Sequence, residues 1–293
     1  MRIAFVGLPL AALLLLEDGH TIVWAGICRA GAIGTRRLRG RLGDRVVVQP
    51  DLAASVAAIR RAEPELLVSW FWTKKIPRQV RAVAPLGGIG VHPSLLPRHR
   101  GPDPTFWAID SGDRETGVTA HVLEDDYDTG AIFGQRKLVI DPSWSAWTLA
   151  KKLDRPSLAL LRATVNAHAS GQPPEPRAQD ERHATEAPSP DEALLEIRWS
   201  EPAESIARRV RAASPWPGAY TEIAGQVVTL TRVRETNDVP RALDVGEACV
   251  RVDGTAVVRA SDGGVELLGA RIDDDDRDLD RADLAALVRD ATH

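Results

Sequence analysis

Two short polar runs contain the side chains of this chain that are best suited to chemistry. GVHPSLLPRHRG at 90–101 contains His92, and EDDYDTG at 124–130 contains Asp128. Each run follows a hydrophobic stretch typical of a β-strand, and loops after such strands are where α/β enzymes place catalytic groups. A histidine and a carboxylate can hold and transfer a proton, so we interpret the two runs as parts of one reaction centre.

Each run also has a simpler interpretation. A single histidine is more often a packed structural residue, and an acidic run is more often a solvated turn. Asp128 differs from the acidic residues before it, because Asp-Thr-Gly favours a tight turn that would direct this one carboxylate inward. The presence of both runs in one chain favours the catalytic interpretation.

The elements that must position these loops alternate between apolar strands and helical segments. Strands are expected at 2–7, 20–28, 45–49, 65–71 and 88–92, with helices at 8–19, 54–64 and 76–85 between them. Strands that are apolar throughout indicate a parallel sheet covered by helices on both faces. A hairpin at 116–125 and 131–140 should extend the sheet, followed by a helical stretch interrupted near Pro156 and ended by Gly171. The predicted fold class is α/β, with a Rossmann-like, mostly parallel sheet.

The composition changes after this helical stretch. Residues 172–190 are rich in Pro and Glu and poor in apolar side chains, so we expect a linker between a catalytic domain at 1–171 and a second domain at 191–293. Short strands at regular spacing predict a small β-barrel in the second domain, which ends in an acidic tail that includes 273–276. From Asp191 onward there are 21 acidic and 13 basic residues, so this domain has a net charge of −8 in a chain of −4.

The motifs, taken in order along the chain, resemble one family of enzymes. Formyltransferases that use 10-formyltetrahydrofolate have loops reading Asn-x-His-x-Ser-Leu-Leu-Pro and Asp-Thr-Gly, which resemble GVHPSLLP and DTG in this chain. MRIAFVG, PELLVSWFWTKKIP and SPWPGAY also fall in the family's order, so the resemblance covers almost the whole chain. The chain most resembles the two-domain members, typified by methionyl-tRNA formyltransferase and sugar N-formyltransferases. The resemblance implies the formyltransferase fold with a smaller, OB-like C-terminal barrel.

The resemblance also implies a role for each motif residue. When an amine attacks the formyl carbon, His92 would donate a hydrogen bond to the resulting oxyanion. Asp128 would hold His92 and accept the amine proton through a water, and Ser94 is retained from the same motif. The formyl donor, 10-formyltetrahydrofolate, would lie against the segment 69–77 and the loop 122–128. The residues expected to bind this donor are Trp70, Phe71, Trp72, Ile76, Pro77, Val122, Leu123, Glu124, Asp125 and Tyr127.

Gly90 departs from the family pattern, because the family has an Asn there that would contact the formyl oxygen. Losing one such donor typically costs about 100- to 1000-fold in rate. One interpretation is that another group, such as Ser69, Thr73 or a water, replaces the Asn. A second is a pocket widened for a different substrate, and a third is a protein that hydrolyses or only binds formyl-folate. We favour the first two because both motifs are otherwise intact; His121 either supports the site or only packs.

Charge narrows the choice of acceptor amine. Binding of tRNA requires Lys and Arg to neutralise phosphates, so an acidic second domain disfavours it. The basic run at 36–41 could bind a phosphate, but a solvated loop is the more common fate of such runs. We expect a small-molecule or carrier-bound amine, with methionyl-tRNA as the alternative.

The remaining sequence features concern location and metals. The apolar N-terminal run is too short to span a membrane, and it continues into a strand without a cleavage site, which favours a cytoplasmic protein. The two cysteines, Cys28 and Cys249, are expected to be reduced, and no metal-ligand spacing is present. The oligomeric state cannot be inferred from these features.

Overall fold

The computed structural model describes residues 1–272 and 277–291, so the acidic run at 273–276 lies outside the described residues. The chain falls into two compact units. The first unit comprises 1–104, 115–139 and 151–188, and the second comprises 105–114, 140–150 and 189–293. The units therefore differ from the predicted domains, because two short segments before residue 171 belong to the second unit.

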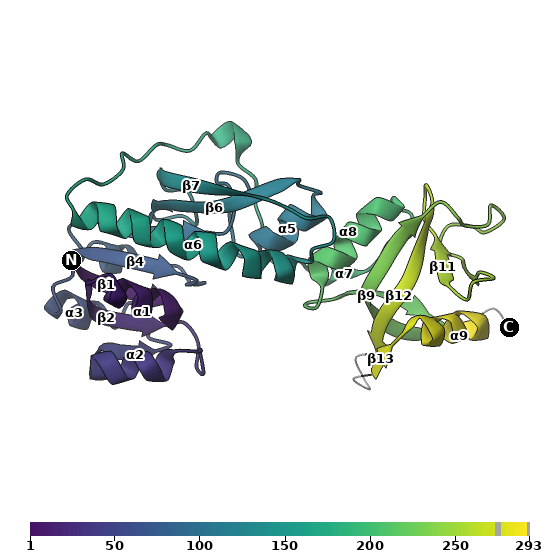
Figure 1. The fold of residues 1–293 in the computed structure, drawn as a ribbon, viewed down its shortest axis with the longest axis horizontal. Coiled ribbons are helices and arrows are strands. Elements are labelled where there is room, and N and C mark those ends of the chain that lie inside the picture. Colours follow the sequence, from purple (N-terminus) through teal and green to yellow (C-terminus); the bar gives the residue numbers. More distant parts are fainter. Residues whose placement is uncertain (273–276, 292–293) are drawn as a thin grey trace. The chain divides into compact units, whose positions relative to one another are not determined.

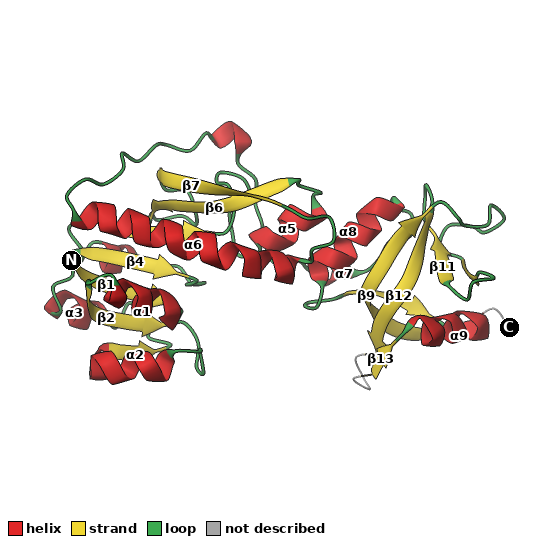
Figure 2. Cartoon of the chain, in the orientation of Figure 1, coloured by secondary structure: helices red, strands yellow, loops and turns green. Residues whose placement is uncertain are grey.

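A seven-stranded sheet organises the first unit (Figures 1 and 2). Its strands lie in the order β3-β2-β1-β4-β5-β6-β7. Their bounds are β1 Arg2–Gly7, β2 Thr21–Ile27, β3 Val46–Val48, β4 Leu66–Trp70, β5 Gly88–His92, β6 Glu115–Val122 and β7 Ile132–Val139. Pairs among β1 to β5 are parallel, and β6 and β7 are antiparallel additions at one edge. The predicted α/β fold with a mostly parallel sheet is confirmed.

Alternate residues of the central strands enter different apolar clusters on the two faces of this sheet. Phe5 of β1 packs in one cluster and its neighbour Val6 packs in the other, and both are fully buried. Helices α1, α2 and α6 contribute to the cluster of Phe5, whereas α3 and α4 contribute to that of Val6. These helices are α1 Pro9–Glu17, α2 Thr35–Leu42, α3 Val56–Arg61, α4 Arg78–Arg81 and α6 Ala146–Ala169. Burial of both faces explains why the strands are apolar throughout.

Two helical regions differ from the predictions. The basic run at 36–41 belongs to α2 rather than to a loop, because Leu38 and Leu42, about one turn apart, are both buried and leave the arginines exposed. Helix α6 runs through Pro156 without the expected interruption. Buried leucines before and after the proline hold the helix, although one backbone hydrogen bond is lost at this position.

The predicted linker is attached to the first unit over most of its length. Arg177 and Ile132 exchange two backbone hydrogen bonds of 2.7 and 2.9 Å. Ala187 is fully buried, and its N–H donates to the carbonyl of Arg100 at 2.6 Å. Residues 172–188 have few apolar side chains to bury, so backbone hydrogen bonds fix their position instead. They belong to the first unit.

An antiparallel sheet organises the second unit, with the strand order β10-β11-β12-β9-β8 and with β13 paired to β12. The strands are β8 Ala219–Ile223, β9 Gln226–Thr236, β10 Ala248–Val250, β11 Ala256–Arg259, β12 Gly264–Ile272 and β13 Arg277–Leu279. The remaining helices are α5 Pro104–Asp110, α7 Glu192–Leu195, α8 Ala203–Ala213 and α9 Arg281–Ala291. The OB-like classification of this unit stays a prediction. Among the described residues, no helix combines the length and apolar character needed to cross a bilayer.

Candidate active site

The candidate site lies at the carboxyl ends of β4 and β5, where open α/β sheets bind ligands. Gly90 of β5 is the register partner of Ser69 on β4 and of His121 on β6. Register partners point to the same face of a sheet, and so do residues two apart, so Ser69, His121 and His92 share the face of Gly90. A cavity of about 340 Å³ lies on this face, and all four residues line it.

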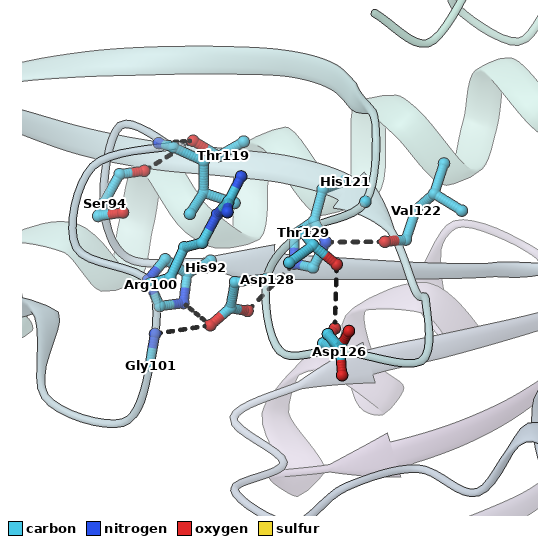
Figure 3. A network of polar contacts seen from close by, with 12 residues as sticks. His92, Ser94, Arg100, Gly101, Thr119, His121, Val122, Asp126, Asp128 and Thr129 are labelled. Carbon is cyan, nitrogen blue, oxygen red and sulfur yellow. Dashed lines mark hydrogen bonds and ion pairs between the residues drawn. The ribbon is translucent and has the colours of Figure 1, made fainter. Parts of the chain in front are cut away.

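Three contacts surround the Asp128 carboxylate inside this site (Figure 3). Its Oδ2 accepts a hydrogen bond from the backbone N–H of Gly101 at 3.0 Å and lies 3.3 Å from Nδ1 of His92. Its Oδ1 lies 3.5 Å from Nε2 of His121. Asp128 has a φ of 58°, in the left-handed region, and its side chain is 16% exposed, whereas that of Asp126 is 81% exposed. The predicted inward turn of this one carboxylate is confirmed.

Both ring nitrogens of His92 contact other residues of the protein. Its Nε2 lies 2.7 Å from the carbonyl oxygen of His99. A carbonyl only accepts, so Nε2 carries a proton and donates it there, while Nδ1 faces Asp128. The structure therefore brings the predicted pair together, but neither nitrogen of His92 is left to reach an oxyanion in this ring orientation. The oxyanion role of His92 stays a prediction.

Ser94, predicted to be catalytic, is placed differently. Its hydroxyl donates to the carbonyl of Arg98 at 2.6 Å, and its own carbonyl accepts from the Thr119 hydroxyl at 2.7 Å. Ser94 is fully buried and is not among the residues that line the cavity. Its position indicates that it fixes the loop after β5 against β6, so a catalytic role finds no support here.

His121 is buried, with its side chain beside Asp128 (Figure 3). Its Nδ1 lies 2.9 Å from the carbonyl oxygen of Val122, to which it donates. Burial lowers the pKa of His121 from its usual value, although the negative charge of Asp128 opposes this shift. A neutral imidazole with its proton on Nδ1 has an unprotonated Nε2, and here that nitrogen faces Asp128.

A side chain at Gly90 would meet two neighbouring side chains at short distances. A Cβ at this position would lie 2.8 Å from Cδ2 of Leu123 and 3.0 Å from Nε2 of His121. Contacts this short require the neighbouring groups to move. The side chain that the family pattern would place at residue 90 would therefore press against atoms of β6 and of the loop after it.

Seven of the ten residues predicted to bind the folate line the cavity. They are Phe71, Trp72, Ile76, Leu123, Glu124, Asp125 and Tyr127. Trp70 does not, because strand alternation turns it into the core, where its Nε1 donates to the Ser157 hydroxyl at 2.8 Å. Val122 is likewise turned away by alternation from His121, and Pro77 lines a neighbouring groove instead.

Two residues that hold the site were not anticipated. Arg81 of α4 donates to the carbonyls of Ile76 at 3.3 Å and Leu123 at 3.1 Å, and it pairs with Asp125, so it joins the two walls of the cavity. Gln179, in the predicted linker, donates to the backbone carbonyl of Asp128 at 2.7 Å. Neither residue lies in a recognisable motif, so only the fold reveals these contacts.

Comparisons with known proteins identify the family. A family profile described as "Formyl transferase" matches residues 46–165, and one described as "Formyl transferase, C-terminal domain" matches residues 191–277. A methionyl-tRNA formyltransferase of Anaeromyxobacter dehalogenans is 33% identical over 288 residues, which cover 93% of this chain and 92% of that protein. The chain belongs to the formyl transferase family. Members of this formyltransferase family use 10-formyltetrahydrofolate as their formyl donor.

Solved structures share the fold of this formyltransferase. HypX from Aquifex aeolicus, in complex with tetrahydrofolic acid, matches with a TM-score of 0.66 and 21% identity over 97% of this chain. The match spans 46% of HypX, so the chain corresponds to about half of that protein. An N-formyltransferase from Helicobacter canadensis, in complex with folinic acid and dTDP-3-aminofucose, matches with a TM-score of 0.68 and 14% identity over 91% of this chain and 98% of that one. The predictions of a formyltransferase family and of an enzyme are confirmed.

Proposed function

We propose that this formyltransferase moves the formyl group of 10-formyltetrahydrofolate to a primary amine at the Asp128 centre. The observation that supports this proposal is a partly buried carboxylate with an imidazole on each side, on the wall of a cavity lined by aromatic, apolar and charged residues. A carboxylate held by fixed donors is already positioned to accept a proton, which typically contributes about 10²- to 10⁴-fold to a rate.

The lining of the cavity fits a reduced folate. Phe71, Trp72 and Ile76 offer flat or apolar contacts for a ring, and Leu123 offers another from the loop after β6. Nε1 of Trp72 is buried and contacts no acceptor among the described residues, so an acceptor at the edge of a ligand would satisfy it. A volume of about 340 Å³ lies within the range of small-molecule sites.

The chemistry at this centre is a transfer with one proton movement. Bound formyl-tetrahydrofolate supplies an activated formyl carbon. The amine nitrogen bonds to that carbon, the bond from the carbon to the folate nitrogen breaks, and the proton lost by the amine ends on the folate nitrogen. Asp128 accepts the proton from the amine, and His92 together with the Gly101 N–H holds its carboxylate in place.

Methionyl-tRNA is the acceptor that we place first. From the sequence we expect a small-molecule amine, but a relative that is 33% identical over 93% of this chain is a methionyl-tRNA formyltransferase. The residues before Asp191 have a net charge of +4, and the arginines at 36–41 are exposed on α2, which suits a phosphate-rich substrate. Net charge over the whole stretch from Asp191 onward is a weaker criterion, because binding depends on local clusters of basic residues.

A small-molecule amine is the second candidate, favoured by the net charge of −8 from Asp191 onward. The two acceptors are separated by supplying 10-formyltetrahydrofolate with either methionyl-tRNA or a panel of amines that includes nucleotide-linked amino sugars, and by identifying the products by mass spectrometry. Formylmethionyl-tRNA supports the first candidate, and a formylated small amine supports the second.

The third interpretation of Gly90 is tested in the same reactions. Release of free formate without a formylated amine would contradict formyl transfer and support a formyl-folate hydrolase. Asp128→Asn, which keeps the shape of the side chain, should lose product formation but still bind 5-formyltetrahydrofolate in calorimetry. Binding without any turnover by the unaltered protein would support a folate-binding protein instead.

A further inference from the structure

His121 fills the space that a side chain at residue 90 would need. The two residues are register partners on adjacent strands, and Nε2 of His121 lies 3.0 Å from the position of a residue-90 Cβ. The same Nε2 lies 3.5 Å from Oδ1 of Asp128. The imidazole thus places a titratable nitrogen beside the Asp128 carboxylate. In the family pattern, the side-chain amide of an Asn at residue 90 would occupy this place.

Backbone carbonyls fix the position of one proton on each imidazole around Asp128. Nε2 of His92 donates to His99, and Nδ1 of His121 donates to Val122. Nδ1 of His92 and Nε2 of His121 therefore face the two oxygens of Asp128. An ionised carboxylate only accepts hydrogen bonds, so each of these contacts is favourable only when a proton lies between its two atoms.

No proton lies between Asp128 and His121 when the His121 imidazole is neutral. Burial and the proximity of His92 both lower the pKa of His121, so its neutral form, with the proton on Nδ1, is favoured. Oδ1 of Asp128 and Nε2 of His121 then form an acceptor–acceptor contact in which one proton is missing.

We propose that His121 is a positioning residue of the transfer reaction, which takes the place of the missing residue-90 side chain and shares, through Oδ1 of Asp128, the proton that the amine releases. This inference rests on the proposed function. A proton arriving on Oδ1 converts the acceptor–acceptor contact into an O–H···N hydrogen bond after a shift of roughly 0.5 Å. When the bond from the formyl carbon to the folate nitrogen breaks, the same proton leaves Asp128 for that nitrogen, so the centre returns to its resting state.

The first test reads the imidazole directly in the protein without ligand. Nitrogen-15 NMR of histidine-labelled protein should find His121 neutral, with its proton on Nδ1, and Asp128→Asn should lower the pH at which His121 titrates, because the carboxylate favours the imidazolium. His92 and Asp128 are the titratable groups that act on His121, so His92→Gln should raise that pH. A proton on Nε2, or a titration unchanged by Asp128→Asn, would overturn the proposal.

The second test is kinetic. His121→Gln keeps polar atoms near the position of Nε2 but cannot hold an added proton, so we expect kcat to fall about 100-fold with little change in the KM for the folate, and the pH profile of kcat to lose one ionisation. The control is His20→Gln, at a buried histidine outside the site that is hydrogen-bonded to Asn166, and it should transfer at the normal rate. Normal kcat for His121→Gln would contradict the proposal.

The two tests separate this inference from the proposed function. If the unaltered protein formylates no amine, the proposed function fails, while the NMR result still decides whether His121 and Asp128 share a proton site. If the unaltered protein is active and His121→Gln is equally active, only the role of His121 fails. Should His121→Gln not fold, shown by loss of 5-formyltetrahydrofolate binding, the NMR result on the unaltered protein decides.

Discussion

Adding a side chain at Gly90 should disturb the reaction centre rather than restore it. A Cβ there meets Cδ2 of Leu123 at 2.8 Å and Nε2 of His121 at 3.0 Å. The leucine methyl is the end of a flexible chain and can rotate, but the imidazole is held at its Nδ1 by the Val122 carbonyl and must be pushed as a whole. Overpacking of this kind costs about 1–3 kcal/mol, partly offset by the roughly 0.4–1 kcal/mol that Gly→Ala gains from the unfolded state.

The expected result for Gly90→Ala is a net loss of about 1 kcal/mol in the free energy of unfolding and a drop in kcat of about tenfold or more. Gly90→Asn should be worse on both measures, because the amide extends further into the same atoms. Gly134→Ala is the matched control: this glycine lies on β7 of the same sheet, and its Cβ would meet only Leu160, at 3.6 Å. It should leave kcat unchanged. Urea denaturation and steady-state kinetics measure both effects.

A rise in kcat for Gly90→Asn would refute this reasoning. That outcome would mean that the space beside Asp128 accepts an amide and that the extra donor helps the reaction, by up to about 100-fold for one oxyanion contact. The site would then be an impaired one, and the hydrolase or folate-binding interpretation would take first place. Equal losses of stability for Gly90→Ala and Gly134→Ala would also contradict the specific contact with His121.

Three further predictions follow from the contacts of the first unit. His92→Ala and Asp128→Ala should each abolish transfer. The double variant should be little slower than either single variant in single-turnover assays, because the rate effects of residues that act as a unit do not add. A double variant whose rate loss equals the product of the two single losses would contradict a single centre. Arg81→Ala should weaken binding of 5-formyltetrahydrofolate about tenfold in calorimetry, because its charged hydrogen bonds join both walls; unchanged affinity would show that the walls hold without it. The hydrogen bond from Arg162 lowers the pKa of Asp18 below its usual value of 3.8. The pair therefore stabilises the folded protein above pH 3.8, and this stabilisation is lost as the pH falls through the lowered pKa. Asp18→Asn should lower the free energy of unfolding by about 1 kcal/mol at pH 7, after allowing for the exposure of Arg162, and should leave it unchanged near pH 2. Urea denaturation at the two pH values measures this, and a difference that does not depend on pH would contradict the role of this pair.

The features that the sequence predicts well are those set by neighbouring residues. Apolar runs such as 2–7 and 65–71 predict the strands, because residues buried on both faces leave no polar alternation. The inward turn of Asp128 follows from Asp-Thr-Gly alone, and the structure confirms it with a left-handed backbone at that residue. The His92–Asp128 contact is expected from the two motifs but not from strand ends: β6 runs antiparallel to β5, so the loop after β6 begins beside Gly88 and turns back to bring Asp128 to His92.

The features that the sequence does not predict depend on register and on distant backbone contacts. Which residue of β6 faces Gly90 is fixed by strand pairing, and a slip by one position would replace His121 with Ala120 or Val122, whose side chains point to the other face. The attachment of 172–188 depends on backbone hydrogen bonds, which composition does not encode. Strand alternation also removes Trp70 from the cavity, although Phe71 beside it remains.

Gly90 and His121 are best understood as one feature that spans two strands. In this arrangement a side chain at residue 90 collides with the imidazole, and a small residue at 121 would leave an empty space beside Asp128. The glycine is therefore what allows the histidine to approach the carboxylate, and its presence does not by itself indicate a lost activity. A polar nitrogen remains next to Asp128, supplied from β6 instead of β5. Because this nitrogen can bind a proton and an amide cannot, the exchange alters how the centre handles the amine proton rather than simply deleting a contact.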